Sequence, residues 1–243
     1  FELSGGSEFD GIDGLSPYLS DSMEILLLKS YDMVDVSKFP TNLTNVCLRS
    51  YTSMIDAYEI SKTLPRTLTQ IEDIDIITDI SSDEIDFTPL VNLKKLKNLN
   101  VTFRSEVYIG DKRTINLVLP PDLDYLSWSG DFYTNNLPPS LKTLKMRGSL
   151  LRVFERDGEG ETFYTSDLPQ SLTSLSVMNI VHYGKNPFPM PNIRRLRFLQ
   201  YQYMDSAVEI SNFLNRVFPN LTLLRDACGH LKHFLDGSRV IMF

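Results

Sequence analysis

The residues best suited to hold a metal ion are found near the end of the chain. Cys228, His230 and His233 could supply one thiolate and two imidazoles. A structural zinc site usually needs four ligands, however, and no second pair of ligands lies nearby in the sequence. We therefore expect no metal at this position and interpret the segment as a cap that covers the end of the fold.

A second candidate is an acidic run interrupted by isoleucines, which contains Asp73, Asp75, Asp79, Asp83, Glu84 and Asp86. Calcium sites use carboxylates at close alternate positions, but the glycine that lets a calcium loop turn sharply is missing here. We expect a solvated loop on the outer side of the fold.

The sequence offers no arrangement for catalysis. It contains no Gly-rich phosphate loop, no serine in a nucleophile elbow, and no cysteine with an orienting histidine at a recognisable spacing. We expect no enzyme and no cofactor, so any function should reside in binding.

A short hydrophobic sequence motif, which we call the repeated phrase, recurs along the whole chain. It defines the elements that position the binding residues. Its pattern is hydrophobic, two others, hydrophobic, one other, hydrophobic, and a proline often precedes it. Nine copies begin at Met23, Leu43, Leu68, Leu96, Leu123, Leu141, Leu172, Ile193 and Leu221. The mean spacing of about 25 residues is typical of solenoid repeats that each carry a strand.

Each copy should form a short strand with one buried face, because its last two hydrophobic residues alternate with a polar one. The proline before the strand cannot donate a ladder hydrogen bond and is expected in the turn that precedes it. Trp128 occupies a buried strand position and is predicted to fill the core. One helix is predicted over 205–218, with Val208, Phe213, Leu214 and Val217 on one face.

The phrases Leu137 to Leu141 and Leu168 to Leu172 resemble the leucine-rich repeat family, in the divergent eukaryotic form of fungal and amoebal F-box-associated proteins. The resemblance implies an α/β solenoid, a horseshoe of about nine repeats with a parallel concave sheet and irregular loops or short helices on the convex side. The asparagine that many members carry after the last strand leucine is absent from most copies here. The expected parts are an N-terminal cap (1–22), the repeats (23–227) and a C-terminal cap (228–243). An F-box is not found in these residues, and we expect any F-box to precede Phe1.

The strand residues that flank the buried ones should face the concave side. Each copy contributes three such positions, for example Gln70, Glu72 and Ile74 in the third copy. Seven of the 27 positions are basic and one is acidic, a net charge of +6 in a chain whose total is −7. We predict that partner-binding residues lie on this face: Arg49, Tyr125, Lys145, Arg147, Arg195, Arg197 and Arg225.

A basic concave face favours an acidic or phosphorylated protein segment, because arginine can make paired hydrogen bonds to carboxylates and phosphates. The resemblance implies that the chain could be the recognition part of a ubiquitin-ligase adaptor. Two alternatives stay open: a structural subunit of a multiprotein assembly, and a secreted or pathogen-derived receptor or effector. Nucleic acid is disfavoured by the net charge of −7 and by the lack of interleaved aromatic residues.

Composition and cysteine content bear on the compartment. The chain has 243 residues, 42% of them hydrophobic, no apolar run long enough to cross a membrane, and no recognisable signal peptide. Its two cysteines, Cys47 and Cys228, lie in distant copies, where a disulfide is not expected. We expect an intracellular protein, although glycosylation-type triplets at Asn42, Asn100 and Asn220 keep the secreted alternative open.

Overall fold

The computed structural model divides into two compact units, Phe1–Trp128 and Ser129–Phe243, and each is described by itself. The structure describes residues 2–4, 19–30, 37, 39–50, 61–76, 84–103, 114–129, 137–147, 150–152, 163–164, 168–177, 179–181, 188–198, 200–202, 207–226, 233–236 and 239–242.

All nine predicted strands are present, and each begins two residues after the first hydrophobic residue of its copy. The first unit contains β2 (Ile25–Ser30), β3 (Asn45–Ser50), β4 (Gln70–Ile76) and β6 (Asn98–Phe103). Strand β8 (Tyr125–Ser129) lies at the C-terminal end of this unit. The second unit contains β9 (Thr143–Arg147), β12 (Ser174–Ser176), β14 (Arg195–Phe198) and β16 (Leu223–Asp226).

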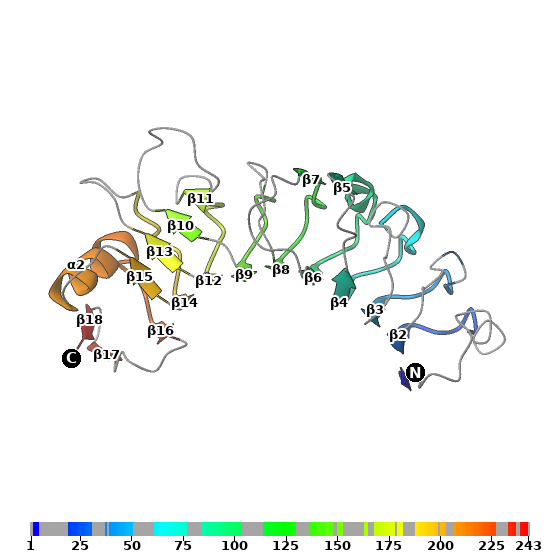
Figure 1. Ribbon diagram of the computed structural model, residues 1–243, viewed down its shortest axis with the longest axis horizontal. Coiled ribbons are helices and arrows are strands. Elements are labelled where there is room, and N and C mark those ends of the chain that lie inside the picture. Colours follow the sequence, from blue (N-terminus) through cyan, green and yellow to red (C-terminus); the bar gives the residue numbers. More distant parts are fainter. Residues whose placement is uncertain are drawn as a thin grey trace. The chain divides into compact units, whose positions relative to one another are not determined.

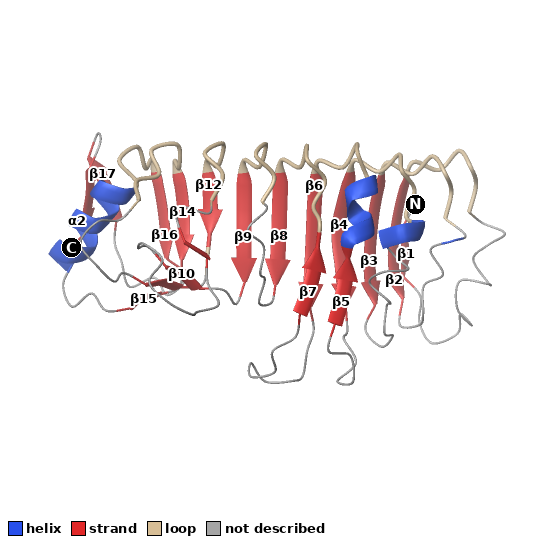
Figure 2. Cartoon of the chain, turned by 90° about the horizontal axis from the view of Figure 1, so that it is seen from above, coloured by secondary structure: helices blue, strands red, loops and turns tan. Residues whose placement is uncertain are grey.

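These strands belong to an open parallel sheet of ten strands, which we call the main sheet, and their order in it follows their order in the chain (Figures 1 and 2). The tenth strand is β1 (Glu2–Ser4), which pairs with β2 at one edge. The sequence pattern does not predict β1, because its three residues are too few to show a period.

The buried side of the main sheet is formed by the predicted hydrophobic positions. Trp128 is fully buried, as predicted, and the ring of Phe87 meets it edge-on with 5.5 Å between the ring centroids. The strands of the main sheet contribute further core residues: Leu26, Leu28, Val46, Leu48, Ile71, Leu99, Val101, Leu126, Leu144, Met146, Leu175, Leu196, Phe198 and Leu224.

The turn before each strand follows one plan. The carbonyl of Pro40 accepts a hydrogen bond from the Leu43 N–H, and the same bond joins Pro138 to Leu141 and Pro169 to Leu172. A carbonyl bonded to the N–H three residues later closes a β-turn. The prolines therefore lie in the turns, as predicted.

Hydroxyl and amide side chains join several copies to the copy before them, and we call these hydrogen bonds the hydroxyl ladder. Thr69 Oγ1 donates to the Thr44 carbonyl at 3.1 Å, and Ser171 Oγ donates to the Leu141 carbonyl at 2.7 Å. Asn42 and Asn220 donate their amide N–H groups to the carbonyls of Asp21 and Pro191, each at 2.8 Å. Two of the three glycosylation-type asparagines thus support the fold directly.

Short parallel strands lie on the side of each unit away from the main sheet, where the sequence predicts irregular loops or short helices (Figure 1). In the first unit β5 (Glu84–Phe87) pairs with β7 (Thr114–Leu117). The second unit has a four-stranded sheet in the order β11-β10-β13-β15, built from Phe163–Tyr164, Leu150–Arg152, Asn179–Val181 and Gln200–Gln202. The expectation of loops and short helices does not include these strands, because strands of two to four residues are too short to show a period.

The sequence predicts a single loop for the acidic run, and this prediction is wrong. Asp73 and Asp75 lie within β4, and Glu84 and Asp86 lie within β5. The alternation of acids with isoleucines in this run is the two-residue period of strands rather than the pattern of a loop.

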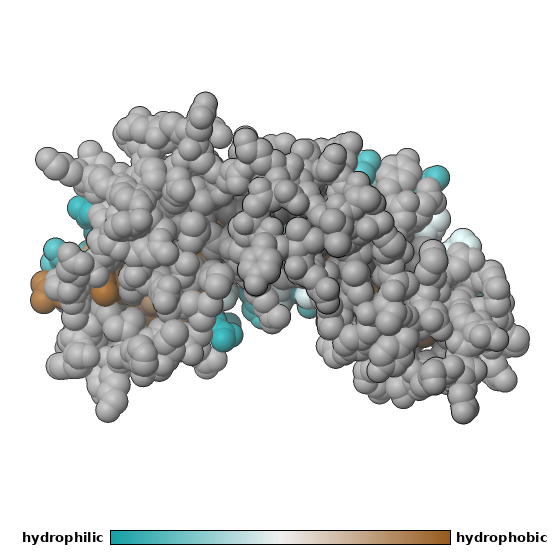
Figure 3. Space-filling view, viewed as in Figure 1, coloured by the Kyte–Doolittle hydropathy of each residue, from teal (hydrophilic) through white to brown (hydrophobic). Residues whose placement is uncertain are grey.

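A 3₁₀ helix, η4 (Thr88–Asn92), follows β5 in the first unit. In the second unit α2 (Ala207–Val217) buries Phe213, Leu214 and Val217 as predicted. Val208, however, is 68% exposed, because it lies about 140° around the helix axis from Phe213. Hydrophobic surface is visible at the α2 end in Figure 3, in brown.

An antiparallel hairpin of β17 (His233–Asp236) and β18 (Arg239–Met242) follows, and β18 contacts α2. Within the described residues, no helix is long and apolar enough to cross a membrane.

Candidate functional site

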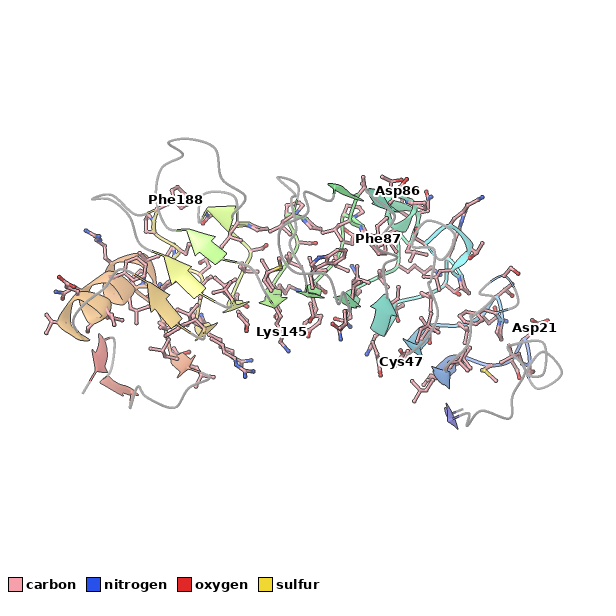
Figure 4. The ribbon with its side chains drawn as sticks, in the orientation of Figure 1. Asp21, Cys47, Asp86, Phe87, Lys145 and Phe188 are labelled. Atoms are coloured by element: carbon pink, nitrogen blue, oxygen red, sulfur yellow. The ribbon has the colours of Figure 1, made fainter. Side chains whose placement is uncertain are left out.

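The side chains that alternate with the buried strand residues form the open face of the main sheet. In the second unit Lys145 is exposed between the buried Leu144 and Met146. Arg195 and Arg197 are likewise exposed on either side of the buried Leu196. Figure 4 shows the Lys145 side chain on the side of its strand away from β10 and β13.

Strand register brings these three cations together. Ser176 pairs with Lys145 on one side and with Arg197 on the other. Because adjacent strands are about 4.8 Å apart, the Cα atoms of Lys145 and Arg197 are separated by roughly 10 Å. Arg195 lies two residues before Arg197 on the same face. We call Lys145, Arg195 and Arg197 the basic strip.

Two further predicted residues belong to the same strands. Arg147 is the last residue of β9, and Arg225 on β16 is the register partner of Arg197. The structure describes their backbone positions, and their side chains lie outside the described part. The remaining face positions of β9, β12, β14 and β16 carry only hydroxyl side chains and one leucine: Thr143, Ser174, Ser176 and Leu223.

The other two predicted partner-binding residues, Arg49 and Tyr125, belong to the first unit. Arg49 is the fifth residue of β3, and its side chain is outside the described part. Tyr125 is partly exposed and lines a groove with Gln70, Glu72, Asn98 and Asn100. This environment is made of amides and a carboxylate, which differs from the chemistry of the basic strip.

A bulge in β4 changes which residues occupy the face of the first unit. Ile71 pairs with Val46, but the next residue of β3, Cys47, pairs with Asp73. Ile74 is therefore level with the buried residues Leu48 and Val101. The sequence predicts a face position for Ile74, but its backbone has the register of a buried position, because Ile71 and Ile74 are three residues apart instead of two and the extra residue is accommodated as a bulge.

The bulge also changes the register of the acidic residues of β4. Glu72 and Asp73 together oppose Asn100, and Asp75 is level with Thr102, which is a face position. The sequence predicts no cation at the face positions of this strand and one acidic residue, Glu72, which is exposed. Two other predicted face residues, Cys47 and Ser127, are buried at 7% and 5% exposure, because these small side chains do not extend past their neighbours.

The segment considered for a metal ion is only partly described. His233 begins β17, whereas Cys228 and His230 lie outside the described residues. In the part of the chain that the structure covers, no three His, Cys, Asp or Glu side chains are grouped as metal ligands would be.

Comparison with known proteins does not identify a relative. No model of a known protein family matches the chain, and no curated protein matches it either.

Proposed function

We propose that this chain is a protein-binding module of the leucine-rich repeat type, and that the basic strip captures an acidic or phosphorylated segment of a partner. The observation that supports this most is the convergence of Lys145, Arg195 and Arg197 on one face through strand register. The three cations come from two copies of the repeated phrase, and the face positions between them carry no acidic residue.

The spacing of the strip suits an extended peptide. Arg195 and Arg197 are two residues apart along one strand, which is about 6.6 Å. Acidic side chains at alternate positions of an extended segment have the same spacing. The parallel backbone holds the cations in place, and each guanidinium can form two hydrogen bonds to a carboxylate or phosphate. Lys145 then adds a point charge roughly 10 Å across the sheet.

The charge balance of the chain makes the strip selective. The net charge is −7, so most of the surface repels an acidic partner while the strip attracts it. A local field of one sign raises the encounter rate of an oppositely charged partner. The same net charge disfavours nucleic acid, whose backbone requires many distributed cations.

A structural subunit would need a continuous apolar surface for its neighbours. The large apolar side chains exposed in the described residues are instead distributed over separate segments of the chain: Ile25, Val118, Phe188, Val208 and Leu223. Single exposed apolar residues are normal for a protein surface. This distribution favours the binding module over the structural subunit.

A panel of labelled peptides of equal length tests the proposal. The panel contains phosphoserine, glutamate, serine or lysine at alternate positions, and binding to the full chain is measured by fluorescence anisotropy. We expect the phosphoserine peptide to bind best, the glutamate peptide next, and the other two not to bind. Affinity should fall as NaCl is raised from 0.05 to 0.5 M, because salt screens exposed charges. Equal binding of all four peptides would refute the proposal.

A further inference from the structure

A groove on the open face of the first unit has a chemistry of its own. It has a volume of about 440 Å³ and is lined by β4, β6 and β8. The residues that line it are Gln70, Ile71, Glu72, Asn98, Asn100 and Tyr125. A volume of this size is within the range of small-ligand sites and is large enough for one long side chain of a partner.

The carboxylate of Glu72 is held in place by two amide groups. The Asn45 Nδ2 and Gln70 Nε2 groups both donate to Glu72 Oε1, at 3.0 and 3.1 Å. Both donors are directed to the same oxygen, so they orient the carboxyl group of an exposed residue. An oriented carboxylate needs less ordering when it binds a ligand.

The groove lining carries negative charge. Glu72 is its one charged residue, and the other lining residues are amides, an isoleucine and a tyrosine. At the face positions of β4, β6 and β8 the sequence carries no lysine or arginine. A ligand that complements this groove must therefore be positively charged.

We propose that this groove binds a lysine or arginine side chain of a protein partner. Glu72 forms the ion pair, and the amide oxygens of Asn98 and Asn100 accept further hydrogen bonds from the cation. Tyr125 supplies an aromatic face that attracts a cation. The site belongs to the first unit and selects the opposite charge from the basic strip, so it does not depend on the proposed function.

A saccharide is the main competing ligand, because amides, a carboxylate and an aromatic ring also suit sugar hydroxyls and rings. A neutral sugar gains nothing from net negative charge, however. The Glu72 carboxylate lines the groove, and no lysine or arginine balances it at the face positions of β4, β6 and β8, which favours the cation.

The test is an NMR titration of the full chain, in which the side-chain amide signals of Asn98 and Asn100 are followed. The probes are an acetylated Gly-Arg-Gly amide, the same peptide with citrulline, which is the neutral isostere of arginine, and a panel of neutral monosaccharides. We expect shifts with the arginine peptide and at least tenfold weaker binding of the citrulline peptide. Equal affinity for the two peptides, no shift with any probe, or shifts with a sugar alone would overturn the proposal.

Matched variants localise the effect. Glu72→Gln should weaken binding of the arginine peptide at least tenfold, and Tyr125→Leu about two- to fivefold. Glu24→Gln makes the same charge change at an exposed residue of the same unit outside the groove lining and should leave affinity unchanged. The emission of Trp128 reports whether each variant is folded. If folded Glu72→Gln binds like the wild type, the assignment of Glu72 is wrong.

Discussion

Arg197 and Arg225 are register partners on the adjacent parallel strands β14 and β16. Their Cα atoms are therefore about 4.8 Å apart. Like charges at directly opposed strand positions destabilise a sheet. A sheet selected for stability alone would place an opposite or neutral residue at one of the two positions, and the proposed binding function accounts for this pairing.

Replacing one of these arginines should stabilise the protein. We expect Arg197→Gln to raise the free energy of unfolding by about 0.2–1 kcal/mol, because it removes the repulsion. Urea denaturation at low salt measures the change. Arg194→Gln, at the exposed position just before the strand, is the control and should have a smaller effect. Destabilisation by Arg197→Gln would show that the arginine has a structural role.

The chain has a single tryptophan, so its fluorescence reports on one site. Trp128 has 0% exposure and packs edge-on against Phe87. We expect emission at short wavelength and weak quenching by iodide in the native state, with a red shift on unfolding. Emission typical of a water-exposed indole in the folded protein would contradict the core position of Trp128.

The hydroxyl ladder should contribute measurably to stability. Ser171→Ala removes the hydrogen bond to the Leu141 carbonyl, and we expect a loss of about 0.5–1.5 kcal/mol. Chemical denaturation gives the value. The exposed neighbour Gln170 provides the control, since Gln170→Ala should change stability by less than about 0.5 kcal/mol. Equal effects of the two substitutions would mean that the ladder does not stabilise the fold.

The β4 bulge should be removable. Deleting Asp73 leaves Ile71 and Ile74 two residues apart, which restores the spacing of the other copies. We expect a folded protein with native Trp128 emission, because Ile74 keeps its place level with Leu48 and Val101. The arginine peptide should bind it more weakly, since one carboxylate is lost from β4. An unfolded deletion variant would show that the bulge is required by the fold.

The sequence predicts the main sheet well because each strand carries its own signal. Buried and exposed residues alternate around Leu144 and Met146, or around Leu196 and Phe198, and a turn signal precedes each such strand. Each strand can therefore be predicted independently of the others. The basic strip follows from the same alternation, since Lys145 and Arg197 each lie between two buried residues and Arg195 precedes the buried Leu196.

Other features depend on information that a local pattern does not carry. The bulge at Glu72 and Asp73 is fixed by pairing with β3 and β6, and the spacing of Ile71 and Ile74 is its one local sign. The short strands β10 and β13 form because successive copies bring their backbones together. Val208 is a different case: its five-residue spacing from Phe213 already places it about 140° around the helix, so the sequence itself could have shown that it lies away from the buried face.

The most direct test of the central claim is charge reversal in the basic strip. Binding of the phosphoserine peptide is measured by calorimetry for the wild type and for the double variant Arg195→Glu/Arg197→Glu. The control, Lys142→Glu/Arg194→Glu, makes the same change in net charge at exposed residues that precede strands β9 and β14.

We expect the strip variant to lose at least about tenfold in affinity, which corresponds to 1.4 kcal/mol, together with most of the salt dependence. The control should retain binding within about threefold, because its changes lie outside the face positions. Equal affinity of the strip variant and the wild type would contradict the account, as would equal losses in the two double variants.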